Sequence, residues 1–198
     1  NEILDPVLPQ YNADCITWTA IGARTTEAQT HRQLASGLSM PVGFKNATDG
    51  ATQTAIDAIL AARSHHSFIG VQEDGTVGVF RTSGNPYAHI VMRGGNGHTN
   101  YGPEFIAYLR VVLKRSGLPQ GIIIDCSHAN SGKDYRKQRV ALDGVLEQIA
   151  SGEDAIRQAG RNLLISFRES VSRELGAIVG ENVSAVYAPD ALAQMIEE

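Results

Sequence analysis

The sequence contains only two cysteines in 198 residues, and this scarcity argues against a disulfide-stabilised framework. Cys15 and Cys126 lie far apart in the chain and do not form a pair with the spacing of a zinc knuckle. We therefore expect both to be reduced thiols.

Long hydrophobic runs are also missing. No apolar stretch approaches the length of about 20 residues that spans a bilayer, and Asn1–Asp5 has neither the basic start nor the apolar core of a signal peptide. These absences predict a cytoplasmic protein with no membrane partner. The chain starts without Met and soon reaches Pro6 and Pro9, so we expect a fragment of a longer protein.

The sequence carries no large charge of one sign. Its formal net charge is −4 and its pI is about 5.9, which gives no indication of a nucleic-acid partner or of an anionic membrane surface. Any site for a phosphate group must therefore be a local cluster of basic residues.

Hydrophobic residues make up 42% of the chain, which is enough for a substantial core in one domain or two small ones. Short apolar runs rich in Ile and Val alternate with segments of helical periodicity. The predicted strands are Cys15–Ile21, Pro41–Phe44, Phe68–Val71, His89–Met92, Ile122–Cys126 and, as a sixth, Leu163–Phe167. The predicted helices are Glu27–Leu38, Gly50–Arg63, Pro103–Ser116 and Lys133–Ala150.

This alternation predicts right-handed βαβ units and a parallel α/β sheet, either doubly wound or closed as a barrel. The segment Gly75–Phe80 interrupts the rhythm and is interpreted as a small hairpin or a loop excursion. In both architectures, ligands bind at the carboxyl ends of the strands, so the residues that follow each apolar run are the first candidates for a site.

Three basic residues stand directly after apolar strands: Arg24, Lys45 and Arg93. Each one alone is most simply a solvated surface charge. If their strands are neighbours, however, the three cations converge on one rim, where an anion would relieve their mutual repulsion. Together they predict an anion site.

The stretch Asp125–His128 places an acid, a thiol, a hydroxyl and an imidazole at the end of another strand. His128 is a catalytic or ligand candidate, although a single imidazole is more often structural and cannot alone hold a metal. Cys126 would share a strand face with His128 if the strand ran that far, and Asp125 is expected to pair with a Lys or Arg. We assign no role to the other histidines, and His31 looks like a helix-surface position.

Four motifs in order resemble the type I class of 3-deoxy-D-arabino-heptulosonate 7-phosphate (DAHP) synthases. They are GARTTE (22–27), ASGLSMPVGFKNATDG (35–50), RGG (93–95) and IDCSHANSGK (124–133). The resemblance extends over about residues 1–156. It implies a (β/α)8 TIM-barrel type of fold, here a partial barrel of about five or six β/α units.

The resemblance also implies an activity, namely the metal-dependent condensation of phosphoenolpyruvate with erythrose 4-phosphate, which opens the shikimate pathway to aromatic amino acids. Several site residues follow by position in the motifs. Arg24, Lys45 and Arg93 resemble the cations that bind phosphoenolpyruvate, Glu2 an acidic residue near it, Thr25 a residue on the sugar-phosphate side, and His128 a metal ligand. Lys45 and His128 are the expected catalytic residues, and the segment with Ser39 is linked in the family to feedback inhibition by aromatic amino acids.

The chain departs from the family pattern at both ends. The first barrel strands, with a cysteine ligand, are absent, and residues 157–198 form a divergent tail in which we expect a strand and a helix packed on the same domain. Only His128 matches among four family ligands; Glu169 and Asp190 are nearby candidates outside the expected motifs. We therefore expect the isolated chain to have little or no synthase activity, the divalent metal to be absent if no other ligand is supplied, and the open sheet to associate as a homo-oligomer.

Two other interpretations stay open at this point. The chain could be a non-catalytic phosphoenolpyruvate-binding or regulatory fragment of such a synthase, which the divergent tail favours. It could also be another phosphoenolpyruvate-condensing aldolase of similar fold, against which the GARTTE and SHANS stretches argue.

Overall fold

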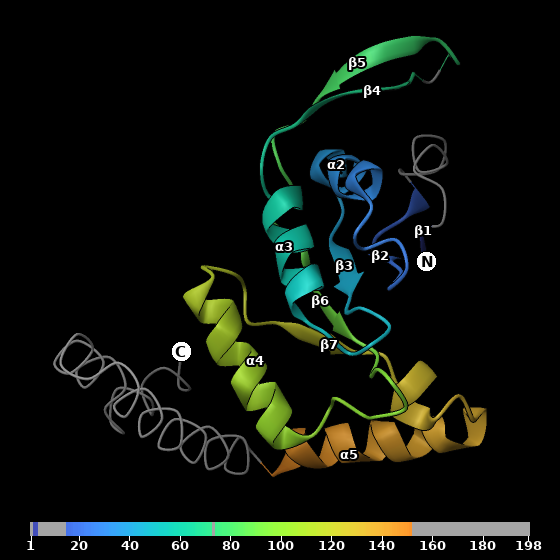
Figure 1. Cartoon of the computed structure of the whole chain (residues 1–198), viewed down its shortest axis with the longest axis vertical. Coiled ribbons are helices and arrows are strands. Elements are labelled where there is room, and N and C mark those ends of the chain that lie inside the picture. Colours follow the sequence, from blue (N-terminus) through green and yellow to red (C-terminus); the bar gives the residue numbers. More distant parts are fainter. Residues whose placement is uncertain (1, 4–14, 73, 152–198) are drawn as a thin grey trace, which may run out of the picture.

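A computed structural model describes residues 2–3, 15–72 and 74–151. Its strands are β1 (Glu2–Ile3), β2 (Thr19–Ile21), β3 (Val42–Lys45), β4 (Ser67–Val71), β5 (Val77–Arg81), β6 (His89–Met92) and β7 (Ile122–Ile124). Its helices are α2 (Gln29–Gly37), α3 (Gln53–Ala62), α4 (Pro103–Arg115) and α5 (Gln138–Ala150), with short 3-10 turns η2 (His128–Ser131) and η3 (Tyr135–Lys137) before α5. Figure 1 shows their arrangement.

Five of the described strands form one parallel sheet in the order β1-β2-β3-β6-β7. The strands follow one another across the sheet in the same order as in the sequence, and the direction of this order never reverses. A doubly wound sheet needs such a reversal, whereas a barrel is built by adding strands in one direction. The topology therefore favours the barrel alternative.

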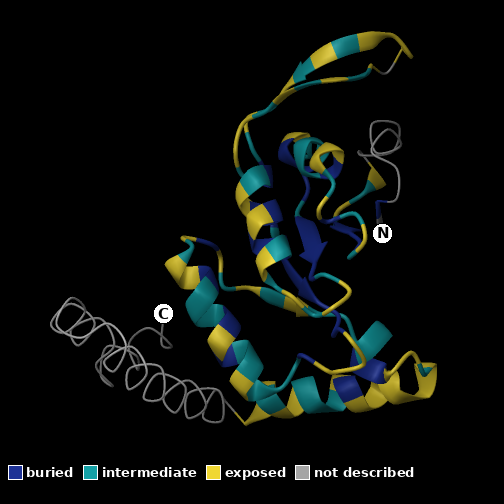
Figure 2. Cartoon of the chain, in the orientation of Figure 1, coloured by how far each residue is buried: buried dark blue, intermediate teal, exposed yellow. Residues whose placement is uncertain are grey.

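The two faces of the sheet have different surroundings. Ile21, Phe44, Ile90 and Met92 alternate onto the face that packs against the helices, and all four are fully buried in the main hydrophobic core. Helix α3 covers β3 and β6 on this side, and these two strands are buried except at the half-buried His89 (Figure 2). The next residue along each strand points to the opposite face, which in a closed barrel is the interior.

The amino ends of the central strands are joined by a Trp–His contact. The indole Nε1 of Trp18 donates a hydrogen bond of 3.0 Å to Nε2 of His89, whose Nδ1 lies 2.9 Å from the carbonyl oxygen of Tyr87. A Cβ on Gly43 would lie 2.9 Å from the indole ring of Trp18, so glycine is needed for this close packing. The contact lies at the end of the sheet opposite to the strand ends predicted to bind a ligand.

The expectation that Phe68–Val71 contributes to the parallel sheet is wrong. β4 and β5 instead pair with each other, antiparallel, in a separate two-stranded sheet that extends away from the rest of the chain (Figure 1). Phe68 and Phe80 stack with ring centroids 5.9 Å apart, while Ile69 on the other face is 76% exposed. This alternation of half-buried and exposed residues belongs to a hairpin, as interpreted for Gly75–Phe80, and not to a strand covered on both faces.

Other expected boundaries shift by a few residues. The strand predicted from Cys15 is limited to β2, the strand predicted to Cys126 ends at Ile124, and the last helix begins at Gln138 after η3. β1 was not predicted, because two residues are too few for a periodic signal. The predicted strand at Leu163–Phe167 lies outside the described residues. Within those residues, no helix has the length and hydrophobicity to span a membrane.

Candidate active site

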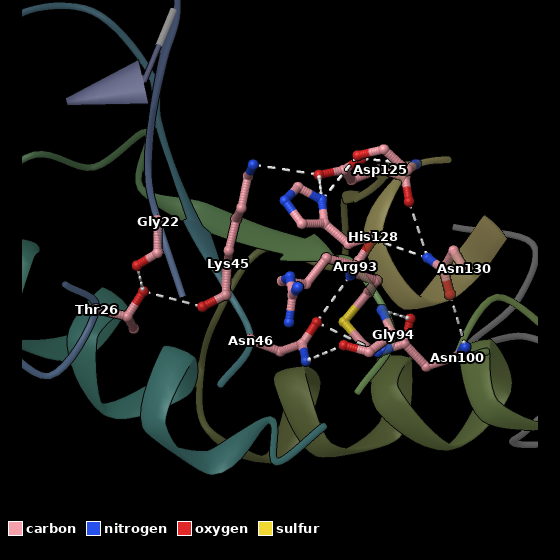
Figure 3. Close-up of polar contacts among 12 residues, drawn as sticks. Gly22, Thr26, Lys45, Asn46, Arg93, Gly94, Asn100, Asp125, His128 and Asn130 are labelled. Carbon is pink, nitrogen blue, oxygen red and sulfur yellow. Dashed lines mark hydrogen bonds and ion pairs between the residues drawn. The ribbon is translucent and has the colours of Figure 1, made fainter. Parts of the chain in front are cut away.

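Three charged residues gather at the carboxyl ends of the central strands. Lys45 is the last residue of β3, Arg93 follows the last residue of β6, and Asp125 follows the last residue of β7. The register pairs Lys45 with Val91 on β6, and Val91 with Ile123 on β7. Arg93 and Asp125 each stand two residues further on, so all three share the face opposite to the helices (Figure 3).

Asp125 pairs with Lys45, as expected for this carboxylate. Lys45 Nζ lies 3.2 Å from Asp125 Oδ2, and the two side chains are only 11% and 17% exposed. The pair joins the ends of β3 and β7 across the end of β6. A buried ion pair in this position orients the ammonium group and compensates part of its charge, so it sets the geometry of the rim.

The same carboxylate also holds His128. Nδ1 of His128 lies 3.1 Å from Asp125 Oδ2 and 2.7 Å from Ser127 Oγ, while Ser127 N donates to Asp125 Oδ1 at 2.9 Å. Because the strand ends at Ile124, the predicted shared strand face of Cys126 and His128 does not form; His128 instead opens η2 with a φ of 54°. Both contacts use Nδ1, which leaves Nε2 as the nitrogen that can meet a ligand.

Burial alone would raise the pKa of Asp125, but the hydrogen bonds from Ser127 and the positive charge of Lys45 outweigh it, so the pKa lies below its ordinary value. For Cys126, burial and the charge of Asp125 both act in one direction and raise the pKa of the thiol. Cys126 is therefore protonated at neutral pH and is not a reactive thiolate.

The lowered pKa of Asp125 predicts a pH-dependent contribution to stability. The stabilisation is present above the unfolded-state pKa of about 3.9 and is lost as the pH falls through the lower folded-state value. We expect Asp125→Asn to lower the free energy of unfolding by about 2 kcal/mol at pH 7 and by progressively less below about pH 4. Urea unfolding in metal-free buffer at several pH values measures this difference.

Asp143→Asn is the matched control, since Asp143 forms an exposed ion pair with Arg139 in α5, 2.8 Å apart. It should change stability much less at every pH, because exposed ion pairs contribute little. A difference between wild type and Asp125→Asn that persisted unchanged at low pH would show that packing, and not charge, carries the effect.

Arg93 is a buried cation. The residue is 8% exposed, and no carboxylate among the described residues pairs with it. Burying a charge without an opposite charge is costly, so a site that keeps one is typical of anion binding. In Figure 3, Arg93 lies among Lys45, His128 and the asparagines of the neighbouring loops.

The other predicted site residues are placed differently. Arg24 lies in the turn after β2 and is exposed. The Thr25 hydroxyl lies 3.2 Å from the carbonyl oxygen of Gly22, within the same turn. Glu2 lies in β1, where its backbone is in register with Ala20 of β2, so it belongs to the same sheet. Ser39 is exposed between α2 and β3.

Sequence reasoning missed several buried polar residues around the site. Thr26 is fully buried, and its hydroxyl lies 2.9 Å from the carbonyl oxygens of both Gly22 and Lys45. Asn46, Asn100 and Asn130 are buried in the loops after β3 and β6 and in η2. The only available signal was their position in the loops that follow the strands, which asparagines in ordinary turns share.

The expectation that His31 lies on a helix surface is wrong. The residue is 5% exposed, and neither ring nitrogen has a hydrogen-bond partner among the described residues. Helix α2 packs against α3, and the periodicity of α2 did not reveal which of its polar residues this contact covers.

The described residues do not by themselves make a metal site. Within this part of the chain, no group of three or more His, Cys, Asp or Glu side chains is placed to hold a metal ion. His128 offers one nitrogen, whereas a bound cation needs about four donors. Glu169 and Asp190, the two further candidates, lie outside the described residues.

Comparisons with known proteins identify the relatives of this chain. A family model described as "DAHP synthetase I family" matches residues 1–158. The Tyr-sensitive phospho-2-dehydro-3-deoxyheptonate aldolase of Salmonella typhimurium is 50% identical over 155 residues, which cover 78% of this chain and 43% of that protein. The Phe-sensitive aldolase of Escherichia coli K12 is 52% identical over 155 residues, covering 78% and 44%.

A solved structure gives the same result for the fold. The phospho-2-dehydro-3-deoxyheptonate aldolase from Francisella tularensis SCHU S4 superimposes with a TM-score of 0.74 at 45% identity, over 77% of this chain and 45% of that one. The predicted fold class, an incomplete barrel of the (β/α)8 type, is confirmed. The chain spans less than half the length of these relatives.

Proposed function

Because the chain belongs to the DAHP synthetase I family, we propose that it binds phosphoenolpyruvate and contributes this half of the site to a DAHP synthase. The reaction joins phosphoenolpyruvate to erythrose 4-phosphate with consumption of one water molecule, and it gives DAHP and inorganic phosphate. The observation that carries the proposal is the buried Arg93 guanidinium beside the Lys45–Asp125 pair at the strand ends.

Phosphoenolpyruvate presents two anionic groups, a carboxylate and a phosphate, close together. A guanidinium binds either group through two parallel hydrogen bonds, and an ammonium binds as a compact charge. Arg93 supplies the first and Lys45 the second, from neighbouring strands with a shared orientation. This pairing fits a small dianion better than it fits a neutral ligand.

The chemistry requires the enol carbon of phosphoenolpyruvate to attack the aldehyde carbon of the sugar phosphate. Fixed cations offset the charges of two anionic substrates, and holding both in one orientation removes a large entropic barrier. In this arrangement Lys45 orients phosphoenolpyruvate, and Asp125 keeps the ammonium and the His128 ring in place. Nε2 of His128 faces the reacting groups.

Further parts of the proposal concern groups beyond this cluster. Arg24 and Glu2 complete the phosphoenolpyruvate side, Thr25 supports the sugar-phosphate side, and His128 is one ligand of a divalent metal whose other ligands the described residues do not supply. The Tyr-, Phe- and Trp-sensitive relatives support an aromatic amino-acid effector, near the segment with Ser39. We also predict that the protein is a cytoplasmic homo-oligomer. Light scattering of the purified chain measures the molecular mass and so tests the oligomeric state.

Calorimetric titration of the 198-residue chain with phosphoenolpyruvate, with and without Mn²⁺, tests the proposal. We expect saturable binding without metal that is lost in the triple variant Arg24→Ala/Lys45→Ala/Arg93→Ala. The exposed triple variant Lys133→Ala/Lys137→Ala/Arg139→Ala serves as a control with the same loss of positive charge. Binding that survives the triple substitution would overturn the site assignment.

A second candidate is a module that binds phosphoenolpyruvate without turnover, which is favoured because the family match ends at residue 158 and residues 159–198 lie outside it. Release of phosphate from phosphoenolpyruvate in the presence of erythrose 4-phosphate separates the two. Turnover by the purified chain, alone or mixed with the remaining part of a related aldolase, supports the synthase, whereas tight binding with no phosphate release in either case supports the module.

A further inference from the structure

Three asparagines close to the proposed site are almost completely buried and have no role in the function proposed above. Asn46 follows β3, Asn100 precedes α4, and Asn130 lies in η2; they are 0%, 5% and 4% exposed. They are joined to one another, since Asn100 Nδ2 donates to Asn46 Oδ1 at 3.2 Å and Asn100 N donates to Asn130 Oδ1 at 3.0 Å (Figure 3). We call these three residues the asparagine cluster.

The asparagine cluster bonds the backbone on both sides of Arg93. Arg93 N donates to Asn46 Oδ1 at 2.8 Å, and Gly94 N donates to Asn100 Oδ1 at 2.8 Å. The carbonyl oxygen of Gly94 accepts from Asn46 Nδ2 at 3.1 Å. The carbonyl oxygen of Met92 accepts from Asn130 Nδ2 at 3.3 Å, beside the ladder bond of 2.8 Å from Asp125 N.

These bonds hold a stretch that is also fixed by packing. Gly94 has a φ of +71°, and a Cβ there would lie 2.8 Å from both Ala129 Cβ and Asn130 N. Asn130 Nδ2 also donates to the carbonyl oxygen of Asp125 at 2.9 Å, so the same network reaches the residue that holds Lys45 and His128. Side chains from three loops therefore determine the backbone from which Arg93 projects.

We propose that the asparagine cluster consists of positioning residues, which act through Arg93 by fixing the direction of its buried guanidinium toward the anion. This inference rests on the proposed binding of phosphoenolpyruvate. The arginine side chain is long and flexible, so a small rotation of its backbone displaces the guanidinium by a distance that matters for two parallel hydrogen bonds. Fixing the backbone beforehand lowers the entropic cost of binding.

Asn46→Ala in the full chain tests the proposal by calorimetry with phosphoenolpyruvate. We expect about tenfold weaker binding. Asn85→Ala is the matched control: Asn85 is equally buried, with Nδ2 bonded to Met40 O at 2.9 Å and Oδ1 to Tyr87 N at 2.9 Å, but it lies before the amino end of β6. It should leave the affinity unchanged. Equal losses in the two variants would overturn the proposal.

A double-mutant cycle separates positioning from a general loss of structure. If Asn46 acts through Arg93, Asn46→Ala should cause no further loss of affinity in an Arg93→Ala background, whereas independent effects would multiply. Multiplication of the two losses would contradict the proposal. Asn100→Ala leaves in place both hydrogen bonds between the Asn46 side chain and the backbone of Arg93 and Gly94, so it should weaken binding less. This variant replaces Asn46→Ala in the test if Asn46→Ala does not fold.

Amide hydrogen exchange gives a readout that needs no ligand. Asn46→Ala should abolish the protection of the Arg93 amide, Asn100→Ala that of Gly94, and Asn130→Ala that of Asn100, because each substitution removes one acceptor. Unchanged protection would refute the backbone role. If the wild-type chain bound no phosphoenolpyruvate, the proposed function and the ligand part of this inference would both fail, while exchange would still decide whether the cluster fixes the loop.

Discussion

Replacing Arg93 by alanine is expected to weaken phosphoenolpyruvate binding by about 100-fold or more, the largest loss for any single residue of the site. The residue is 8% exposed, so water screens its interaction with an anion only slightly. Removing one partner of such a desolvated, hydrogen-bonded charge pair costs several kilocalories per mole. Calorimetry on the full chain measures the ratio of dissociation constants.

The same substitution should leave the free energy of unfolding unchanged or raise it. In the described residues, Arg93 is buried without a carboxylate partner, so the ligand-free protein bears the desolvation cost of this cation. A substitution that abolishes binding while stabilising the fold is the pattern expected where a site is organised for a ligand. A large loss of stability in Arg93→Ala would instead assign the residue a structural role.

Arg24→Ala provides the comparison. Arg24 is exposed in the turn after β2, and an exposed charge pair contributes about 1 kcal/mol or less, which corresponds to a loss of up to about fivefold. Arg93→Lys should recover only part of the affinity, because an ammonium cannot reproduce the paired hydrogen bonds of a guanidinium. Equal losses for Arg24→Ala and Arg93→Ala would contradict the argument from burial.

Gly95→Ala is expected to lower the free energy of unfolding by about 3 kcal/mol or more. A Cβ on Gly95 would overlap the backbone N and Cα of Gly50 and lie 2.5 Å from the carbonyl carbon of Asp49. These are backbone atoms, so a change of side-chain rotamer cannot relieve the overlap. Urea unfolding followed by circular dichroism measures the shift in the transition midpoint.

The loops after β3 and β6 must separate to accept this methyl group. Their separation would also remove the hydrogen bond of 3.2 Å from Asn96 N to Thr48 O. Gly121→Ala is the matched control, since a Cβ there meets no atom within 4 Å. Similar midpoints for the two variants would show that the loops are not held in contact.

The convergence of Lys45 and Arg93 was predictable from the sequence because parallel strands bring their carboxyl ends to one edge. Asp125 could likewise be assigned a basic partner. The third member of the predicted set behaves differently: Arg24 stands three residues beyond β2, and a turn of that length can direct a side chain toward solvent. Spacing along a strand, including the residue directly after it, predicts a face, but spacing further into the turn does not.

The hairpin and the asparagine cluster show why other features escaped prediction. Phe68–Val71 is as apolar as a buried strand, and only its pairing with β5 shows that Ile69 faces water and that the other three residues are half-buried. Asparagines are common in turns, so Asn46, Asn100 and Asn130 carry no individual signal. Their role arises from three loops that meet in space, which no local pattern encodes.

The hydrogen bond between Trp18 and His89 has a practical consequence, because Trp18 is the only tryptophan of the chain. Its indole fluorescence reports on the amino end of β2, β3 and β6, whereas Arg93 and Lys45 lie at the carboxyl end. Emission from this single tryptophan, excited selectively over the six tyrosines, therefore follows unfolding of the sheet without direct quenching by a bound anion. Trp18 is therefore an intrinsic probe that records the unfolding of the protein separately from the binding of a ligand at the carboxyl end.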